Sequence, residues 1–219
     1  MKKIILFLAL CFSITYSFGQ RALNQELKLV DGLYLNINEF KKDAPSRLWR
    51  EYEVVWTYNT KLKCYQVENI HKKGHPGSGI QDSVWGFTIK GIPYIRISPD
   101  SSGRPLTLFA ELTVRGLINI FSYEKENQEL FPMKAYNPLT GTVFRKGVVK
   151  RNITTIERRI FHLKDDLIIP YDKDILEQWM EKDKEILRAL RFASEEEYEE
   201  KLTRALIVFN GRYPFIIQK

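Results

Sequence analysis

The sequence SVWGFTIKGIPYIRIS, residues 83–98, decides the expected fold. Two runs of β-branched and aromatic residues flank Lys90 and Gly91, and a glycine at this place supplies the positive φ that a two-residue turn requires. In that register Phe87 faces Tyr94 across two antiparallel strands. Both faces of this hairpin are substantially apolar, and it forms the centre of the expected β-structure.

The strand pattern continues on both sides of this hairpin. Alternating apolar and polar residues predict strands at residues 33–37, 51–58 and 64–70 and two further hairpins, 106–114 with 117–123 and 156–163 with 167–170. Between these hairpins, residues 124–152 show little periodicity and contain Pro132, Pro138 and Gly141. We expect this segment to be a linker or a mobile excursion.

The pattern changes after Pro170, where apolar residues recur at helical spacing. Asp172 is placed to cap a helix of about four turns. Ser194 and Glu197 have the spacing of a capping box at the start of a second helix. The sequence therefore predicts a C-terminal pair of helices.

Together these patterns predict an α+β fold in one domain, residues 20–219. A curved antiparallel β-sheet built from successive hairpins is expected over about residues 31–170, with the helical pair of residues 172–211 packed on it. Cys64 is the only cysteine after residue 19, so no internal disulfide is expected there and packing must provide stability. We expect Cys64 itself to be a buried apolar filler.

Residues 1–19, MKKIILFLALCFSITYSFG, have the form of an export signal, because Lys2 and Lys3 precede an apolar run that ends in small residues. We expect cleavage after Gly19 and a periplasmic or extracellular mature protein. The apolar run is shorter than the ~20 residues of a membrane span, and we expect no transmembrane span in the mature chain. Lipidation at Cys11 and an uncleaved anchor remain open as alternatives.

Four blocks of sequence resemble a family of secreted proteins of unknown function from Bacteroidota. The resemblance spans nearly all of residues 31–215 and rests on these blocks: DGLYLNINEFKKDAPS (31–46), SVWGFTIKGIPYIRI (83–97), FHLKDDLIIPYDKDIL (161–176) and VFNGRYPF (208–215). The resemblance implies a small exported envelope protein. It assigns no catalytic residue.

The chain is mildly basic, and its net charge falls from +7 to +5 once Lys2 and Lys3 are removed. Such an excess favours weak attraction to an anionic polysaccharide, a lipid headgroup or an envelope protein, and export argues against nucleic acid. Within residues 145–159 the only acid is Glu157, beside the cations Arg145, Lys146, Lys150, Arg151, Arg158 and Arg159. This segment is a candidate anion-binding site, and the alternative is a basic face that is only solvated.

Aromatic residues of the central hairpin form a second candidate surface. Trp85, Phe87 and Tyr94 share one face in the expected register, and Arg96 lies beside them. Flat rings next to a guanidinium can stack on a sugar or on a partner side chain. With Arg158 and Arg159 these four residues are the candidate ligand-binding set, and burial in the core is the alternative role of the rings.

No catalytic motif is found in the sequence. His71 and His75 with Cys64 make a weak case for a metal site, His162 suits a structural role on a strand, and Glu111 is the one acid whose apolar neighbours indicate burial. We therefore expect no catalytic residue, metal site or cofactor, and a non-enzymatic binding or accessory protein. The alternatives are a hydrolase acting on envelope or dietary polymer, which needs a second acid beside Glu111, and a structural subunit of an envelope complex.

Overall fold

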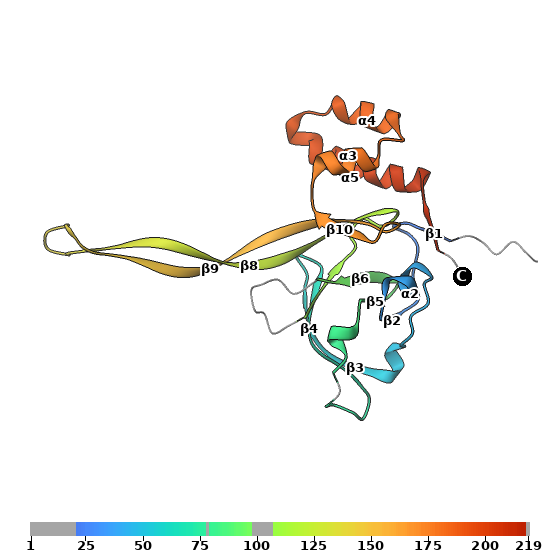
Figure 1. Ribbon diagram of the computed structural model, residues 1–219, viewed down its shortest axis with the longest axis horizontal. Coiled ribbons are helices and arrows are strands. Elements are labelled where there is room, and N and C mark those ends of the chain that lie inside the picture. Colours follow the sequence, from blue (N-terminus) through green and yellow to red (C-terminus); the bar gives the residue numbers. More distant parts are fainter. Residues whose placement is uncertain (1–20, 78, 98–106, 218–219) are drawn as a thin grey trace, which may run out of the picture.

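The computed structural model describes residues 21–77, 79–97 and 107–217 (Figure 1). Strands make up 46% and helices 24% of the structure, which confirms the expected α+β class. Two larger antiparallel sheets, a two-stranded sheet and a group of C-terminal helices form the body of the molecule (Figure 1). The predicted export signal, residues 1–19, lies outside the described residues.

The larger sheet is curled and has six antiparallel strands in the order β2-β5-β6-β7-β4-β3. The central hairpin is confirmed, because Phe87 pairs with Tyr94 and both turn residues, Lys90 and Gly91, have positive φ values of 53° and 78°. Two positive φ values in succession are the signature of the tight turn that joins twisted strands. The strands are β2 (Gly32–Tyr34), β3 (Tyr52–Asn59), β4 (Cys64–Lys72), β5 (Gly86–Ile89), β6 (Ile92–Arg96) and β7 (Thr107–Glu111).

The second sheet has three antiparallel strands in the order β10-β9-β8, with bounds β8 (Ile118–Tyr136), β9 (Val143–His162) and β10 (Leu167–Pro170). The hairpin expected between 156–163 and 167–170 is confirmed, since Leu167 pairs with His162. The residue before Leu167, Asp166, adopts a positive φ of 57° in the connecting turn. After β10 the chain enters the C-terminal helices, which pack on this sheet.

Two sequence predictions are wrong in this region. Residues 124–152 are not a linker: most of them belong to one long hairpin, in which β8 pairs with β9 from Ile118 to Tyr136. The hairpin expected between residues 106–114 and 117–123 is reduced to a single bridge between Val114 and Ile120. Strand β7 pairs instead with β4 and β6, so β7 and β8 belong to different sheets.

The two ends of the described chain lie together, because β1 pairs antiparallel with β11. Short elements connect the strands of the six-stranded sheet, and the Asn36 side chain caps α2 by accepting a hydrogen bond from the Glu39 N–H at 3.0 Å. The remaining bounds are β1 (Arg21–Leu23), β11 (Phe215–Ile217), α2 (Ile37–Lys41) and the 3-10 helices η1 (Trp49–Glu51) and η2 (Gln81–Ser83).

The C-terminal region has three helices and not the expected pair: α3 (Lys173–Trp179), α4 (Lys184–Arg191) and α5 (Glu195–Arg212). The segment predicted as one helix of about four turns breaks at Asp183, whose side chain accepts from the Ile186 N–H at 3.1 Å and caps α4. Arg212 at the end of α5 holds the same carboxylate at 2.9 Å. A cap therefore forms inside a segment whose apolar spacing alone indicates a continuous helix.

The strands of residues 31–170 are divided between two sheets and do not form the one sheet that was expected, and the helices pack on the three-stranded sheet (Figure 1). Leucines of α3 and α5 and Phe209 meet isoleucines of β8 and β9 in one buried cluster: Leu176, Leu202, Leu206, Phe209, Ile118, Ile120 and Ile160. Asn210 fixes the position of α5, because its buried amide accepts from the Ile118 N–H at 3.0 Å and donates to the Ile118 carbonyl at 2.7 Å. Gly116 gives room for this contact, since a Cβ there would lie 2.3 Å from Cγ of Asn210.

Candidate functional site

The hairpin of β8 and β9 extends beyond the body of the molecule. Its base is buried from Ile118 to Phe121, whereas the residues from Gln128 onward are mostly exposed. Figure 1 shows this part as a two-stranded projection that extends far from both the sheets and the helices. We call residues 124–156 the arm and residues 130–151 the distal arm.

The distal arm carries five cations and no acid: Lys134, Arg145, Lys146, Lys150 and Arg151. No described carboxylate forms an ion pair with any of the five, whereas several cations of the body are paired, as Arg21 is with Asp43 at 2.7 Å. Lys134 pairs directly with Lys146 across the ladder, so two like charges face each other. Like charges at such a position destabilise a hairpin, and an anion bound between them would remove the repulsion.

Large apolar side chains accompany these cations on both faces of the distal arm. On its two strands the most exposed are Leu130 at 66%, Val148 at 65% and Met133 at 56%. On one face Phe131 pairs with Val149, and the Arg151 guanidinium lies 5.9 Å from the centre of the Phe131 ring. Exposed apolar side chains gathered in one place usually mark a surface that meets a partner or a membrane.

The turn at the end of the arm exposes one leucine to solvent. Tyr136 and Val143 form the last pair of the ladder, and the Asn137 N–H donates to the Thr142 carbonyl at 2.8 Å. The Asn137 side chain then accepts from the Leu139 N–H at 2.9 Å, which orders the turn around a leucine that is 92% exposed. The tip of the arm, residues 135–143, is thus hydrogen-bonded and apolar at its apex.

Arg158 and Arg159 lie at the base of the arm, away from its tip. The Arg158 guanidinium pairs with Glu199 of α5 at 3.0 Å and lies 4.1 Å from the centre of the Tyr171 ring. Tyr171 donates to the same carboxylate at 2.8 Å, and burial together with this hydrogen bond raises the pKa of Tyr171. Arg159 lies 3.9 Å from Glu157. The Arg158 contact joins α5 to the sheet, the Arg159 contact lies within β9, and both arginines therefore already have partners within the fold.

The aromatic residues of the central hairpin are divided between two hydrophobic clusters. Phe87 and Tyr94 are buried together with a ring-centre distance of 5.4 Å. Trp85 is half-buried in a different cluster, where its ring lies 5.1 Å from that of Phe40. The Arg96 guanidinium donates to the Asp82 carbonyl. The structure therefore does not bring these four side chains together on one exposed face.

The two histidines and the cysteine considered for metal binding differ in burial and in the contacts they make. Cys64 is buried as expected, its thiol donates to the Ser122 carbonyl at 3.1 Å, and burial raises its pKa to about 12. His71 is buried on β4, 3.3 Å from Glu53, whereas His75 is exposed. Over the described ranges, no three His, Cys, Asp or Glu side chains gather as a metal site.

His162 and Glu111 have structural partners. The His162 ring lies 5.0 Å from that of Trp179, between the sheet and α3, and burial lowers its pKa against the opposing effect of Asp165 at 2.8 Å. The Glu111 carboxylate is mostly buried and lies 3.5 Å from Lys63. Both placements fit a role in holding the fold.

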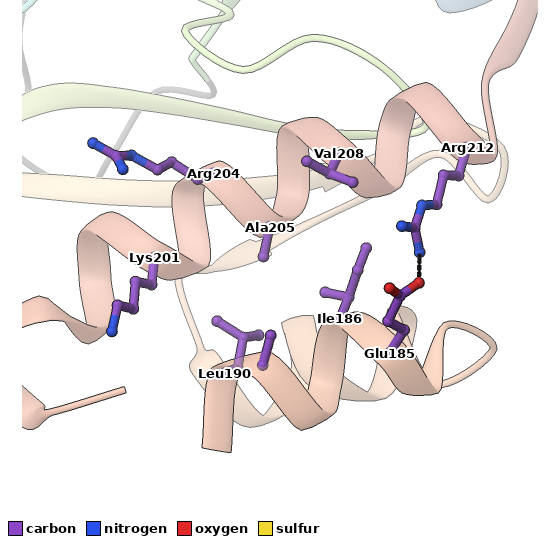
Figure 2. Close-up of a pocket in the computed structure, with 9 residues that line it drawn as sticks. Glu185, Ile186, Leu190, Lys201, Arg204, Ala205, Val208 and Arg212 are labelled. Carbon is purple, nitrogen blue, oxygen red and sulfur yellow. Dashed lines mark hydrogen bonds and ion pairs between the residues drawn. The ribbon is translucent and has the colours of Figure 1, made fainter. Parts of the chain in front are cut away.

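A groove with a volume of about 360 Å³ lies between α4 and α5. Figure 2 shows Ile186 and Leu190 of α4 facing Ala205 of α5 across it. The cations at its rim are all paired within the helical region, Lys201 with Glu197, Arg204 with Glu200 and Arg212 with Glu185. In contrast to the distal arm, this groove offers no unpaired positive charge.

Sequence reasoning identified the basic residues 145–151 but missed their partner strand. A cation-rich stretch without acids extends through residues 130–151, and its mirror placement of Lys134 and Lys146 around a Pro-Leu-Thr-Gly turn could have indicated a hairpin. Among the described residues no helix is long and apolar enough to cross a membrane. No protein-family model, curated protein or solved structure matches the chain.

Proposed function

We propose that this chain is an exported, non-enzymatic binding or accessory protein of the cell envelope, and that it attaches to an anionic partner through the distal arm. The export segment at residues 1–19 and the resemblance to secreted Bacteroidota proteins support the compartment. The shape supports binding, because the arm carries its charged and apolar side chains far from the body.

The observation that carries the proposal is the concentration of five cations without any acid on the exposed distal arm. Lys134 and Lys146 face each other across the ladder, and two unit charges about 5 Å apart in water repel by roughly 0.8 kcal/mol, which is the upper scale of their repulsion. An anionic partner turns the same arrangement into an attraction. Cations without neighbouring acids also create a positive potential that attracts an anionic partner from a distance, so association depends on salt.

A hydrolase remains the competing function, with Glu111 as its candidate acid. Glu111 lies on β7 of the six-stranded sheet, and its carboxylate is paired with Lys63. This pairing supports a structural role for Glu111. A structural subunit is the other competitor, and it would use apolar contacts without a requirement for anions.

The test compares charge reversal on the arm with an equal reversal on the body. Lys134→Glu with Lys146→Glu keeps a like-charged pair in the hairpin and changes only its sign, so the hairpin should remain as stable as before. Arg188→Glu with Arg191→Glu on α4 makes the same change in net charge and serves as the control. The probes are immobilised heparin and vesicles containing phosphatidylglycerol, each titrated with salt.

The wild-type chain and the α4 variant should bind at least one of the two probes in a salt-dependent manner. The arm variant should bind at least about thirtyfold more weakly, because each basic residue at an anionic surface contributes about 1 kcal/mol. Equal weakening in both variants would show a general charge effect and overturn the arm as the site. Absence of salt-sensitive binding by the wild-type chain would favour the function of a structural subunit.

A further inference from the structure

We infer that the partner of the distal arm is an anionic lipid bilayer and that the tip, residues 135–143, inserts into the boundary between the headgroups and the acyl chains. This inference rests on the proposed function and names the chemistry of its ligand. It is carried by the order of apolar and charged residues along the arm.

The apex of the arm is apolar and the cations follow directly behind it. Leu139 is 92% exposed at the turn, and Tyr136 and Val143 come next on the two strands. Lys134 and Lys146 form a charged pair behind them, and Arg145 lies beside this pair. Aliphatic and tyrosine side chains with a collar of Lys and Arg are what the membrane interface prefers, since rings lie at the headgroup level and cations meet lipid phosphates.

The distance between apex and collar matches the depth of the interface. About three strand residues at ~3.3 Å each separate the lysine pair from the turn, which gives roughly 10 Å. Amphipathic segments at membrane surfaces bury their apolar side chains by about 5–10 Å. With the lysine pair at the phosphates, Leu139 would therefore reach the acyl boundary and go no deeper.

Other occupants fit the arm less well. An acidic polysaccharide would neutralise the cations but leave the apolar side chains of the tip, Tyr136, Leu139 and Val143, in water. A second copy of the arm would bring ten unpaired cations together, since each distal arm carries five and no acid. A bilayer satisfies both the charge and the apolar apex.

The experiment separates insertion from electrostatic attachment. Leu139→Asp removes the apolar apex, and Phe192→Asp removes an exposed apolar side chain of the helical region as the matched control. Binding is measured by sedimentation with phosphatidylcholine vesicles, with and without about one third phosphatidylglycerol. All variants share the same N-terminal segment, so differences between them report the arm.

A second readout measures depth. The four native tryptophans, Trp49, Trp56, Trp85 and Trp179, lie in the body and provide a baseline. Leu139→Trp adds a fluorophore at the apex, and lipids brominated on their acyl chains should quench it while leaving the wild-type emission nearly unchanged.

The inference predicts that Leu139→Asp weakens binding to the anionic vesicles by about tenfold to a hundredfold, as the loss of one buried leucine does, and that Phe192→Asp binds like wild type. The added emission of the Leu139→Trp variant should be quenched on anionic vesicles only. If Leu139→Asp binds normally and the Leu139→Trp emission is not quenched while the lysine reversal still abolishes binding, insertion is wrong and the proposed function stands. If the wild-type chain binds heparin in a salt-dependent manner but not the vesicles, the lipid is wrong and the anionic partner is a polymer.

Discussion

The contact between Asn210 and Ile118 should contribute a large part of the stability that holds α5 to the sheet. The Asn210 side chain is 2% exposed and satisfies both the N–H and the carbonyl of Ile118, which lies 92 positions earlier in the chain. Asn210→Ala removes both hydrogen bonds and leaves two buried backbone groups without a partner. Each such group costs about 1–3 kcal/mol, so we expect the free energy of unfolding to fall by about 3 kcal/mol.

The assay is urea unfolding followed by circular dichroism and by tryptophan fluorescence. Val208→Ala is the control on the same helix, because Val208 is 47% exposed and its truncation should change stability by no more than about 0.5 kcal/mol. Gly116→Ala attacks the same contact from the other side, where the added Cβ would lie 2.3 Å from Asn210 Cγ, and should cost about 1–3 kcal/mol. A stability of Asn210→Ala within about 0.5 kcal/mol of the Val208→Ala control would refute the reasoning.

Three further predictions address the body of the molecule. Trp85→Ala should lower the free energy of unfolding by about 3 kcal/mol and leave binding to anionic vesicles unchanged, whereas lost binding with unchanged stability would restore Trp85 as a ligand contact. Because burial raises the pKa of Cys64 to about 12, iodoacetamide should modify Cys64 in urea but not in the folded protein, and equal rates measured by peptide mass would contradict this. Because burial lowers the pKa of His162 below 6.5, the folded state takes up its proton less readily than the unfolded state, so stability falls as the pH is lowered through 6.5. His162→Phe, which keeps a ring beside Trp179, should reduce this slope in urea midpoints, and an unchanged slope would show that other groups cause it.

The central hairpin was predictable because its signals are local. The positive φ at Lys90 and Gly91 follows from turn chemistry, and the pairing of Phe87 with Tyr94 follows from a two-residue turn. The inward residues of α5, such as Leu202 and Leu206, were predictable for the same reason, since helical spacing on one buried face is a strong pattern.

The arm was not predictable from periodicity. Strand prediction depends on one buried and one exposed face, and both faces of the distal arm are exposed, so Leu130 and Phe131 are adjacent apolar residues on opposite faces. The break between α3 and α4 was missed because Asp183 is buried as a cap, a role that apolar spacing does not reveal.

The role of Gly116 also depends on distant structure. Gly116 falls between the two strands of the hairpin expected over residues 106–114 and 117–123, whereas the structure requires it for the close approach of Asn210 from α5. The division of Trp85 from Phe87 and Tyr94 has a similar cause, because two separate hydrophobic clusters take up neighbouring residues of one hairpin.

The most direct test of the arm as the binding site is amide hydrogen exchange with and without phosphatidylglycerol-containing vesicles. The account predicts that exchange slows within residues 130–151 when vesicles are added, that it stays unchanged in α4 and α5, and that high salt removes the protection. Protection confined to the helices or to the six-stranded sheet, with residues 130–151 unchanged, would contradict the central claim.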